Sequence, residues 1–303
     1  MKKAVIDIGS NSVKFLVSEL ASDGIIKNIL DTNEIARLGE GLEKDGLLTE
    51  EAIKRNTEAV RGFYEKAVEM GACEVKAVGT MALRKAKNRD EFLKRVKNAC
   101  GLEISVVPGE EEARLSYLGV LSGFSFEDEA VTAFDTGGGS TEFIFGEGRE
   151  LKERFSINLG ANRIKENYLI SDPVSDAEIK RAREDILNEL KDAGIKKEHS
   201  LLIGIGGTVT TMASVKAKME VYDADKIQGS VLTKADVEAE LAMCKNMTVE
   251  ERRRIVGLHP KRAEIVVAGA LIVDTIMETA GAKELKVSDR GLRHGLMKLL
   301  FEQ

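Results

Sequence analysis

The chain has 303 residues, of which 43% are hydrophobic, and a formal net charge of −6. A chain of this length and composition supports two domains, each with its own core. The negative charge argues against general nucleic-acid binding, which needs a basic surface, but it leaves room for a polyanionic ligand held by local arginines. The longest apolar run, Ile265 to Val273, is too short to span a membrane. We therefore expect a cytoplasmic protein that binds neither nucleic acid nor a membrane.

The first half of the chain alternates predicted strands and helices. Strands are expected near 3–8, 13–20 and 25–34, a helix at about 50–70, a strand near 74–79, a helix at about 88–99, a strand at 103–107 and a helix at about 109–122. This alternation predicts an α/β sheet.

The second half begins again in the same way. A strand near 131–135 leads into hairpin strands up to about 158, and helices follow Gly160 and Ser175. A strand is then expected at 201–205, and helices are expected at 233–245, 248–257 and 260–280. A strand near 284–288 and a terminal helix complete the chain's predicted elements. Ser175 with Glu178, and Thr248 with Glu251, have the spacing of capping boxes. We expect two related domains, 1–126 and 127–303, with a cleft between them and the boundary near 124–128. Whether the terminal helix packs back on the first domain stays open.

Two glycine-rich acidic turns recur 128 residues apart. Asp7-Ile8-Gly9-Ser10-Asn11-Ser12 and Asp135-Thr136-Gly137-Gly138-Gly139-Ser140 each lie between two apolar strands. Small residues let backbone N–H groups point into one concavity, which suits phosphate oxygens. The neighbouring carboxylate can hold a hard divalent cation. A single Asp of this kind usually caps its own turn, but two at equivalent positions favour a metal and phosphate site.

A third loop, Gly206-Gly207-Thr208, follows an apolar strand and precedes a helix, so that a helix N-terminus would face an anion. Taken alone, a glycine turn at this place is ordinary in α/β proteins. The loop is not a Walker A motif, because no lysine follows in the required position.

Together these motifs resemble the exopolyphosphatase/guanosine pentaphosphate phosphatase (Ppx/GppA) family of the actin-like, sugar-kinase-like ATPase superfamily. Further matches are Gly79–Arg84, Pro108–Arg114, Leu159–Ala161, Asp172-Pro173, Gly204–Thr208, His259–Ala263, Ala268–Ala270 and Ser288–Gly295. The resemblance implies two related actin-like/ribonuclease H-like α/β domains, each with a mixed sheet flanked by helices, and an active site in the interdomain cleft. It also implies the short two-domain form, which lacks the helical HD-type domain of longer relatives. Homodimers occur in the family.

The resemblance also assigns roles to individual side chains. Glu112 matches the glutamate that activates water, although an acidic run in a first helical turn is commonly only a complement to the helix dipole. Arg84 matches an arginine that contacts phosphate. Asp7, Asp135 and Glu142 are expected to hold Mg²⁺ or another divalent cation, and the phosphate-binding set comprises Ser10, Asn11, Ser12, Arg84, Gly137, Gly138, Gly139, Ser140, Gly206, Gly207 and Thr208.

Several other residues receive a structural interpretation or none. The run Arg252-Arg253-Arg254 indicates a surface helix, the three histidines (His199, His259 and His294) are taken as structural or surface residues, and Cys73, Cys100 and Cys244 are expected to be reduced and mostly buried. Lys85, Lys87 and Arg89 fit either a basic patch that follows a phosphate chain or a solvated helix face. The roles of Glu111 and Arg293 stay open.

The leading hypothesis is a Mg²⁺-dependent hydrolase that releases terminal orthophosphate from inorganic polyphosphate, with guanosine pentaphosphate as another substrate. One alternative is a sugar- or acetate-kinase-like phosphotransferase, since the superfamily shares the paired turns. The other is a non-catalytic sensor of polyphosphate or of a nucleotide alarmone. The sequence does not rank the two substrates, and it leaves chain-length preference and oligomeric state open.

Overall fold

The computed structural model describes residues 1–21, 25–124, 126, 129–148, 150–196 and 201–302. They form two units: unit 1 is Met1–Ser122 with Leu292–Gln303, and unit 2 is Gly123–Gly291. The chain therefore returns to unit 1 for its terminal helix. The boundary expected near 124–128 falls mostly on residues outside the described ones.

Unit 1 contains a five-stranded mixed sheet in the order β3-β2-β1-β4-β5. Its strands are β1 Lys2–Ile8, β2 Val13–Leu20, β3 Ile26–Glu34, β4 Ala72–Gly79 and β5 Ile104–Val106, and its helices are α1 Leu42–Asp45, α2 Glu50–Glu69, α3 Met81–Lys85, α4 Arg89–Cys100, α5 Gly109–Leu121 and α13 Leu292–Glu302. The pairs β1/β2 and β2/β3 are antiparallel, whereas β1/β4 and β4/β5 are parallel.

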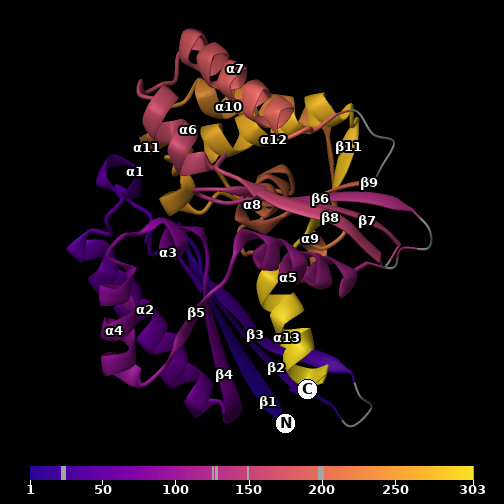
Figure 1. The fold of residues 1–303 in the computed structure, drawn as a ribbon. Coiled ribbons are helices and arrows are strands. Elements are labelled where there is room, and N and C mark those ends of the chain that lie inside the picture. The colour runs from indigo at the N-terminus through magenta and orange to yellow at the C-terminus, as the bar shows by residue number, and fades with distance from the viewer. Residues whose placement is uncertain (22–24, 125, 127–128, 149, 197–200, 303) are drawn as a thin grey trace. The chain divides into compact units, whose positions relative to one another are not determined.

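Both faces of the unit 1 sheet are covered by helices, with α2 and α4 on one face and α13 on the other (Figure 1). Because successive side chains of a strand point to opposite faces, Ile6 and Phe15 join the core beneath α2 while Val5 and Leu16 pack against Met297 of α13. Burial on both sides explains why Ala4, Val5 and Ile6 of β1 are all apolar and do not alternate with polar residues.

Unit 2 contains a six-stranded mixed sheet in the order β10-β11-β9-β6-β7-β8. Its strands are β6 Ala130–Thr136, β7 Thr141–Glu147, β8 Glu150–Ile157, β9 Leu201–Ile205, β10 Val231–Thr233 and β11 Glu284–Ser288; its helices are α6 Ala161–Tyr168, α7 Asp176–Asp192, α8 Gly206–Lys216, α9 Ala224–Ile227, α10 Lys234–Lys245, α11 Val249–Arg252, the 3₁₀ helix η1 Pro260–Arg262 and α12 Val266–Ala280. The run β8-β7-β6-β9-β11 repeats the order and directions of β3-β2-β1-β4-β5. The two units thus share one topology, as the repeated pattern predicts.

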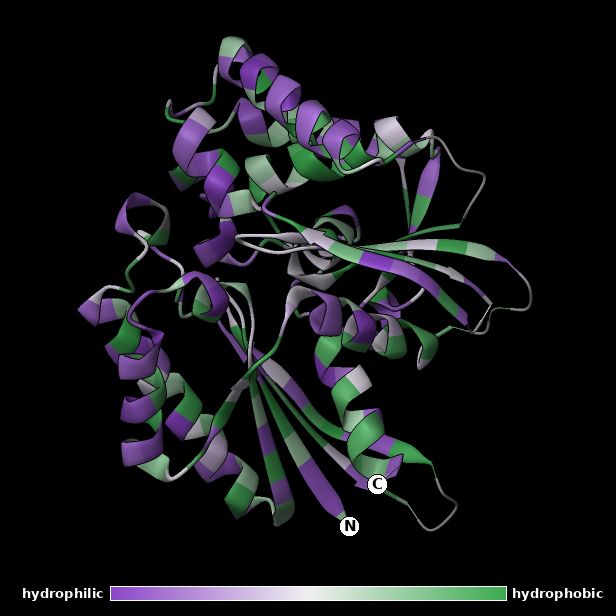
Figure 2. Cartoon of the chain, viewed as in Figure 1, coloured by the Kyte–Doolittle hydropathy of each residue, from purple (hydrophilic) through white to green (hydrophobic). Residues whose placement is uncertain are grey.

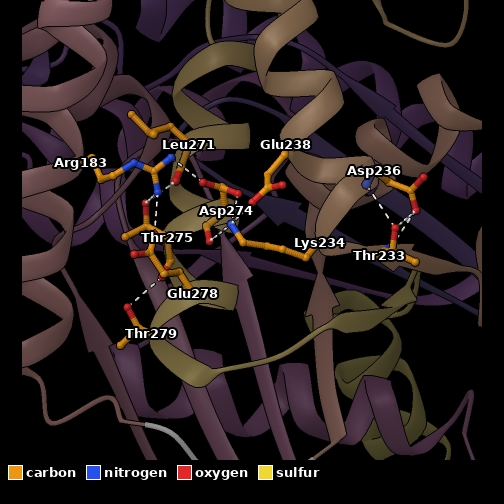
Figure 3. Close-up of polar contacts among 10 residues, drawn as sticks. All are labelled: Arg183, Thr233, Lys234, Asp236, Glu238, Leu271, Asp274, Thr275, Glu278 and Thr279. Carbon is orange, nitrogen blue, oxygen red and sulfur yellow. Dashed lines mark hydrogen bonds and ion pairs between the residues drawn. The ribbon is translucent and has the colours of Figure 1, made fainter.

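The core of unit 2 is built around α12, which is buried from Val266 to Met277. Figure 2 colours much of α12 green, whereas α7 carries mainly hydrophilic residues. Within the buried stretch of α12 one side chain is charged: Asp274 lies between Arg183 of α7 and Lys234 of α10 (Figure 3). Ion pairs therefore link α12 to two neighbouring helices.

The long helices expected at 248–257 and 260–280 are wrong in extent. Helix α11 ends at Arg252, the short η1 begins at Pro260, and α12 starts only at Val266. Gly257, in the segment between α11 and η1, has a φ of 90°, and a Cβ there would lie 2.6 Å from the carbonyl carbon of Ser214. Such a close backbone approach, in a left-handed conformation, requires glycine. Both expected capping boxes are confirmed at α7 and α11.

Candidate functional site

The first acidic turn closes the β1–β2 hairpin in unit 1. Asp7 lies one residue before the end of β1, is 3% exposed, and stands opposite Lys14 in the strand register. The Lys14 ammonium lies 3.5 Å from Asp7 Oδ2. In the turn itself, the N–H of Gly9 donates to the carbonyl of Ser12 (3.0 Å).

The second acidic turn has the same construction in unit 2. Asp135 lies one residue before the end of β6 and stands opposite Glu142 of β7. The N–H of Gly137 donates to the carbonyl of Ser140 (2.9 Å), which matches the hydrogen bond in the first turn. Register and turn geometry are therefore equivalent, but the cross-strand partner is a cation in unit 1 and a carboxylate in unit 2.

The first turn carries buried hydrogen-bond donors. Ser10, Asn11 and Ser12 are each at least nine-tenths buried. Within the described part of the chain, Asn11 Nδ2 and Ser12 Oγ have no hydrogen-bond partner. Buried polar groups are nearly always paired, so these two donors fit a turn that receives an oxygen-rich ligand.

The second turn is fixed by the start of α6. The N–H groups of Ala161 and Asn162 donate to the carbonyls of Gly137 (3.0 Å) and Gly138 (2.7 Å). Gly160 lies directly against this turn, because a Cβ there would be 2.5 Å from Gly138 C. The carbonyls of Gly137 and Gly138 are thus satisfied within unit 2, and the turn has a defined shape without a ligand.

The third loop approaches the second turn within unit 2. Gly206 has a φ of 80°, and a Cβ on it would lie 2.9 Å from Asp135 Cγ. Thr208 Oγ1 donates to the carbonyl of Thr136 (2.8 Å). The 11-residue helix α8 begins here without a side-chain N-cap hydrogen bond. Its first N–H groups and its dipole favour an anion at this end.

The proposed base and the proposed phosphate-binding arginine contact each other in unit 1. Arg84, on the short helix α3, donates from Nη1 to Glu112 Oε2 (2.5 Å) and to the carbonyl of Val107 (3.0 Å). Their side chains are 22% and 13% exposed. Glu111 instead forms a two-point ion pair with Arg114 on the same helix, α5 (2.7 and 2.8 Å). The two neighbouring glutamates therefore have different partners: Glu112 contacts Arg84 of α3, and Glu111 contacts Arg114 of its own helix.

A further cation, not selected from the sequence, lies beside the third loop. A Cβ on Gly207 would be 2.6 Å from Arg262 Nη1, so the guanidinium rests on this loop. Burial lowers the pKa of Arg262, and electrostatic interactions with Tyr222 and Asp135 oppose that shift. Arg262 belongs to the segment His259–Ala263, one of the segments that resemble the family, and this resemblance is the sequence feature that could have indicated it.

A small pocket, with space for about one water molecule, adjoins this loop. Its lining residues are Gly207, Thr208, Thr211, Met212, Arg262, Ile265, Val266 and Gly269. The walls are mainly apolar, and the arginine supplies a charged group on one side.

Arg252 and the cysteines differ from what the sequence predicts, and the contacts of Arg293 indicate a role that the sequence left open. Arg252 is not a surface residue: it is 2% exposed and donates to the carbonyls of Cys244 (2.7 Å) and Ala263 (3.3 Å). Cys73 is exposed, so the cysteines, all free thiols, are not mostly buried. Arg293 pairs with Asp31 through two hydrogen bonds (2.8 and 2.9 Å), which indicates a structural role.

The carboxylate of Asp31 also contacts His294, which is buried: Asp31 Oδ2 lies 3.2 Å from His294 Nε2. Burial alone would raise the pKa of Asp31, but the charge of Arg293 and the hydrogen bond from His294 outweigh it and lower that pKa. His259 caps η1 by accepting from the N–H of Lys261 (3.2 Å). His199 lies outside the described residues.

Of the three carboxylates expected to bind metal, Asp7 lies in unit 1, whereas Asp135 and Glu142 lie in unit 2. Among the residues the structure describes, no three His, Cys, Asp or Glu side chains gather closely enough to hold an ion on their own. Asp135 and Glu142 are cross-strand neighbours, and Glu142 is 2% exposed and accepts from Ser156 Oγ (2.8 Å). Two carboxylates suit Mg²⁺, which keeps several of its waters and needs few protein ligands.

No helix in the described part of the chain is both long and apolar enough to cross a membrane.

Two units of one topology, each with a carboxylate beside a glycine–serine turn at the same hairpin, define a two-domain protein of the actin-like fold. A sequence model of the Ppx/GppA phosphatase family matches residues 16–301. The chain belongs to the Ppx/GppA phosphatase family, and the expected resemblance and fold class are confirmed.

Individual relatives agree with this assignment. The bifunctional 3-dehydroquinate synthase/phosphatase of Fusobacterium nucleatum is 35% identical over 301 residues, and the match spans 95% of this chain but only 45% of that protein. Exopolyphosphatase 2 of Mycobacterium tuberculosis is 30% identical over 308 residues, with 97% of this chain and 96% of that protein covered. The crystal structure of the Aquifex aeolicus Ppx/GppA family member is 35% identical with a TM-score of 0.84, and covers 100% of this chain and 99% of that one.

Proposed function

We propose that this protein is a Mg²⁺-dependent hydrolase that releases terminal orthophosphate from inorganic polyphosphate. Membership of a phosphatase family and similarity to a protein named exopolyphosphatase 2 support this proposal. The observation that carries it is the contact of Arg84 with Glu112 (2.5 Å), because it places a cation that can bind phosphate beside a carboxylate that can accept a proton.

In this proposal Glu112 takes a proton from a water molecule as the water oxygen attacks the terminal phosphorus. The bridging P–O bond breaks, and its oxygen stays with the shortened chain as the leaving group. Arg84 and the donors of the turns hold the phosphate oxygens. These donors come from Ser10, Asn11, Ser12, Gly137, Gly138, Gly139, Ser140, Gly206, Gly207 and Thr208.

Mg²⁺, when bound, neutralises charge on the phosphate oxygens. Asp7, Asp135 and Glu142 would hold it, in part through water. All three side chains are buried or half-buried. They belong to equivalent hairpins of the two units, and because the hairpin strands are paired, their backbones are fixed before any ion binds.

Guanosine pentaphosphate is the second candidate substrate. Membership of the Ppx/GppA phosphatase family supports it. A kinase-like transfer to a second substrate and a purely sensing role remain as rivals, and phosphate release in the absence of any acceptor excludes both.

The test is phosphate release by purified protein, with Mg²⁺ or with EDTA, on short polyphosphate, long polyphosphate, guanosine pentaphosphate and ATP. We expect Mg²⁺-dependent release from polyphosphate. We expect Glu112→Gln to lower kcat by at least about 100-fold, the usual contribution of a general base, while polyphosphate binding is retained.

The matched control is Glu111→Gln, which neutralises the neighbouring glutamate that pairs with Arg114. Its kcat should stay within a few-fold of the wild-type value. Wild-type turnover by Glu112→Gln would remove the base from the mechanism, and ADP formation that depends on a second substrate would favour the kinase.

A further inference from the structure

Arg37 has a backbone conformation that arginine rarely adopts. Among the described residues other than glycine, only Arg37 (φ 48°) and Lys218 (φ 49°) have a positive φ. Lys218 has an ordinary explanation, because it follows α8 and completes a Schellman motif through the hydrogen bonds Lys218 N–H to Val215 O (3.0 Å) and Met219 N–H to Ser214 O (3.1 Å). Arg37 lies between β3 and α1 and ends no helix, so its conformation needs another cause.

The segment 36–39, here called the clasp, holds the first acidic turn. The N–H of Arg37 donates to the carbonyl of Asn11 (2.9 Å), and the N–H of Gly39 donates to the carbonyl of Ser10 (2.8 Å). A Cβ on Gly39 would lie 3.1 Å from Ser10 Cβ. The clasp and the turn are therefore in direct backbone contact, within unit 1.

Helix α2 fixes the clasp from the other side. Arg55 donates from Nε to the carbonyl of Ala36 (2.6 Å) and from Nη2 to the carbonyl of Arg37 (3.2 Å). The buried Asn56 adds a bond from Nδ2 to the Ala36 carbonyl (2.9 Å), and Leu38 is fully buried. An unfavourable φ persists only where its surroundings determine it in this way.

Glycine or asparagine would adopt this conformation more easily than arginine. Residue 37 is half-buried, and its backbone is hydrogen-bonded to a turn whose buried donors, Asn11 Nδ2 and Ser12 Oγ, lack partners among the described residues. A guanidinium has the donor geometry for phosphate oxygens. We propose that Arg37 is a further phosphate-binding residue, which the strained clasp presents to the substrate at the first turn. This inference rests on the proposed function.

The test uses Arg37→Gly and Arg37→Asn, which tolerate the positive φ but remove the charge. We expect the KM for polyphosphate to rise about tenfold or more in both, as for the loss of one charge-assisted hydrogen bond, with kcat within about twofold. Because the backbone is relaxed, the Tm without ligand should not fall. Lys218→Gly makes the same backbone change in unit 2 and should leave KM unchanged.

A second readout separates this inference from the proposed function. Inorganic tripolyphosphate with Mg²⁺ should raise the Tm of the wild-type protein more than that of either Arg37 variant. Wild-type phosphate release with unchanged KM and unchanged Tm response in the Arg37 variants would overturn the role of Arg37 alone. If the wild-type protein releases no phosphate, the proposed hydrolase fails, and the Tm comparison still decides whether Arg37 binds phosphate.

Discussion

The carboxylate of Asp135 occupies the space that a side chain on Gly206 would need. The two residues lie on different elements of unit 2, Asp135 near the end of β6 and Gly206 at the start of α8. The position of the carboxylate therefore depends on the absence of a Cβ at a distant point of the sequence. Gly206 is therefore needed for the position of the Asp135 carboxylate in the second acidic turn, in addition to any contact that it makes with phosphate.

Gly206→Ala should displace Asp135 and reduce activity. A Cβ at this position would lie 2.9 Å from Asp135 Cγ and would also require alanine at a φ of 80°. We expect kcat/KM for polyphosphate to fall more than tenfold and the free energy of unfolding to fall by about 2–3 kcal/mol, the sum expected for backbone strain and overpacking. Steady-state kinetics and urea denaturation measure the two effects.

Gly194→Ala is the matched control, because Gly194 has a φ of 78° and open space where its Cβ would lie. It should reproduce the strain, about 1 kcal/mol, without the loss of activity. Equal losses of kcat/KM in both variants would show that the contact with Asp135 is irrelevant.

Gly160→Ala tests the support of the second turn. The φ of Gly160 is −139°, so alanine meets no backbone strain, but its Cβ would lie 2.5 Å from Gly138 C. We expect the turn to shift and kcat/KM to drop at least tenfold, with about 1–3 kcal/mol lost from the free energy of unfolding. Gly62→Ala, in α2 with nothing near its Cβ, should instead stabilise by about 0.5–1 kcal/mol and keep full activity. Full activity of Gly160→Ala would argue against a phosphate-binding role for this turn.

The sequence predicts the parts of the fold that local interactions determine. Each acidic turn lies between two strands that pair directly, so about a dozen consecutive residues decide its structure. For that reason Asp7 and Asp135 could be identified as equivalent, and the capping boxes at Ser175 and Thr248 could be placed.

Contacts between distant segments could not be predicted in this way. A run of three arginines gives no sign that Arg252 alone turns inward, where it satisfies the carbonyl of Cys244 at the end of α10. Likewise, nothing near Gly207 in the sequence indicates Arg262, because η1 brings that residue across from another part of unit 2. Short helices such as α3 were also missed, since five residues show no periodicity.

Asp274→Asn should weaken the contacts among three helices of unit 2. Asp274 is 2% exposed and pairs with Arg183 (2.5 Å) and with Lys234 (Figure 3). Removing its charge leaves two cations with poorer partners, and we expect a loss of about 2 kcal/mol in the free energy of unfolding, less than for a fully buried pair because both cations are partly exposed. Glu278→Gln removes the exposed partner of Arg183 and should change stability by less than about 1 kcal/mol. Equal effects of the two substitutions would contradict this ranking.

Glu240 should make the stability of unit 2 depend on pH. This side chain on α10 is 6% exposed, its Oε1 atom has no hydrogen-bond partner among the described residues, and burial raises its pKa to about 8. A carboxyl group whose pKa is higher in the folded than in the unfolded state stabilises the protein below the unfolded value, near 4.5, and this contribution is lost as the pH rises through about 8. We therefore expect wild-type stability to decline across this interval.

Glu240→Gln should remove that decline, because the amide does not ionise. The free energy of unfolding of the variant, relative to the wild-type protein, should increase by about 2–3 kcal/mol between pH 5 and pH 8, within the limit of about 1.4 kcal/mol per pH unit for one proton. Glu184→Gln, at an exposed position on α7, should give a difference that is independent of pH. Urea denaturation at several pH values measures all three proteins. Parallel pH profiles for the wild-type protein and Glu240→Gln would show that Glu240 is already ionised at neutral pH, which requires a cation or water at its buried oxygen.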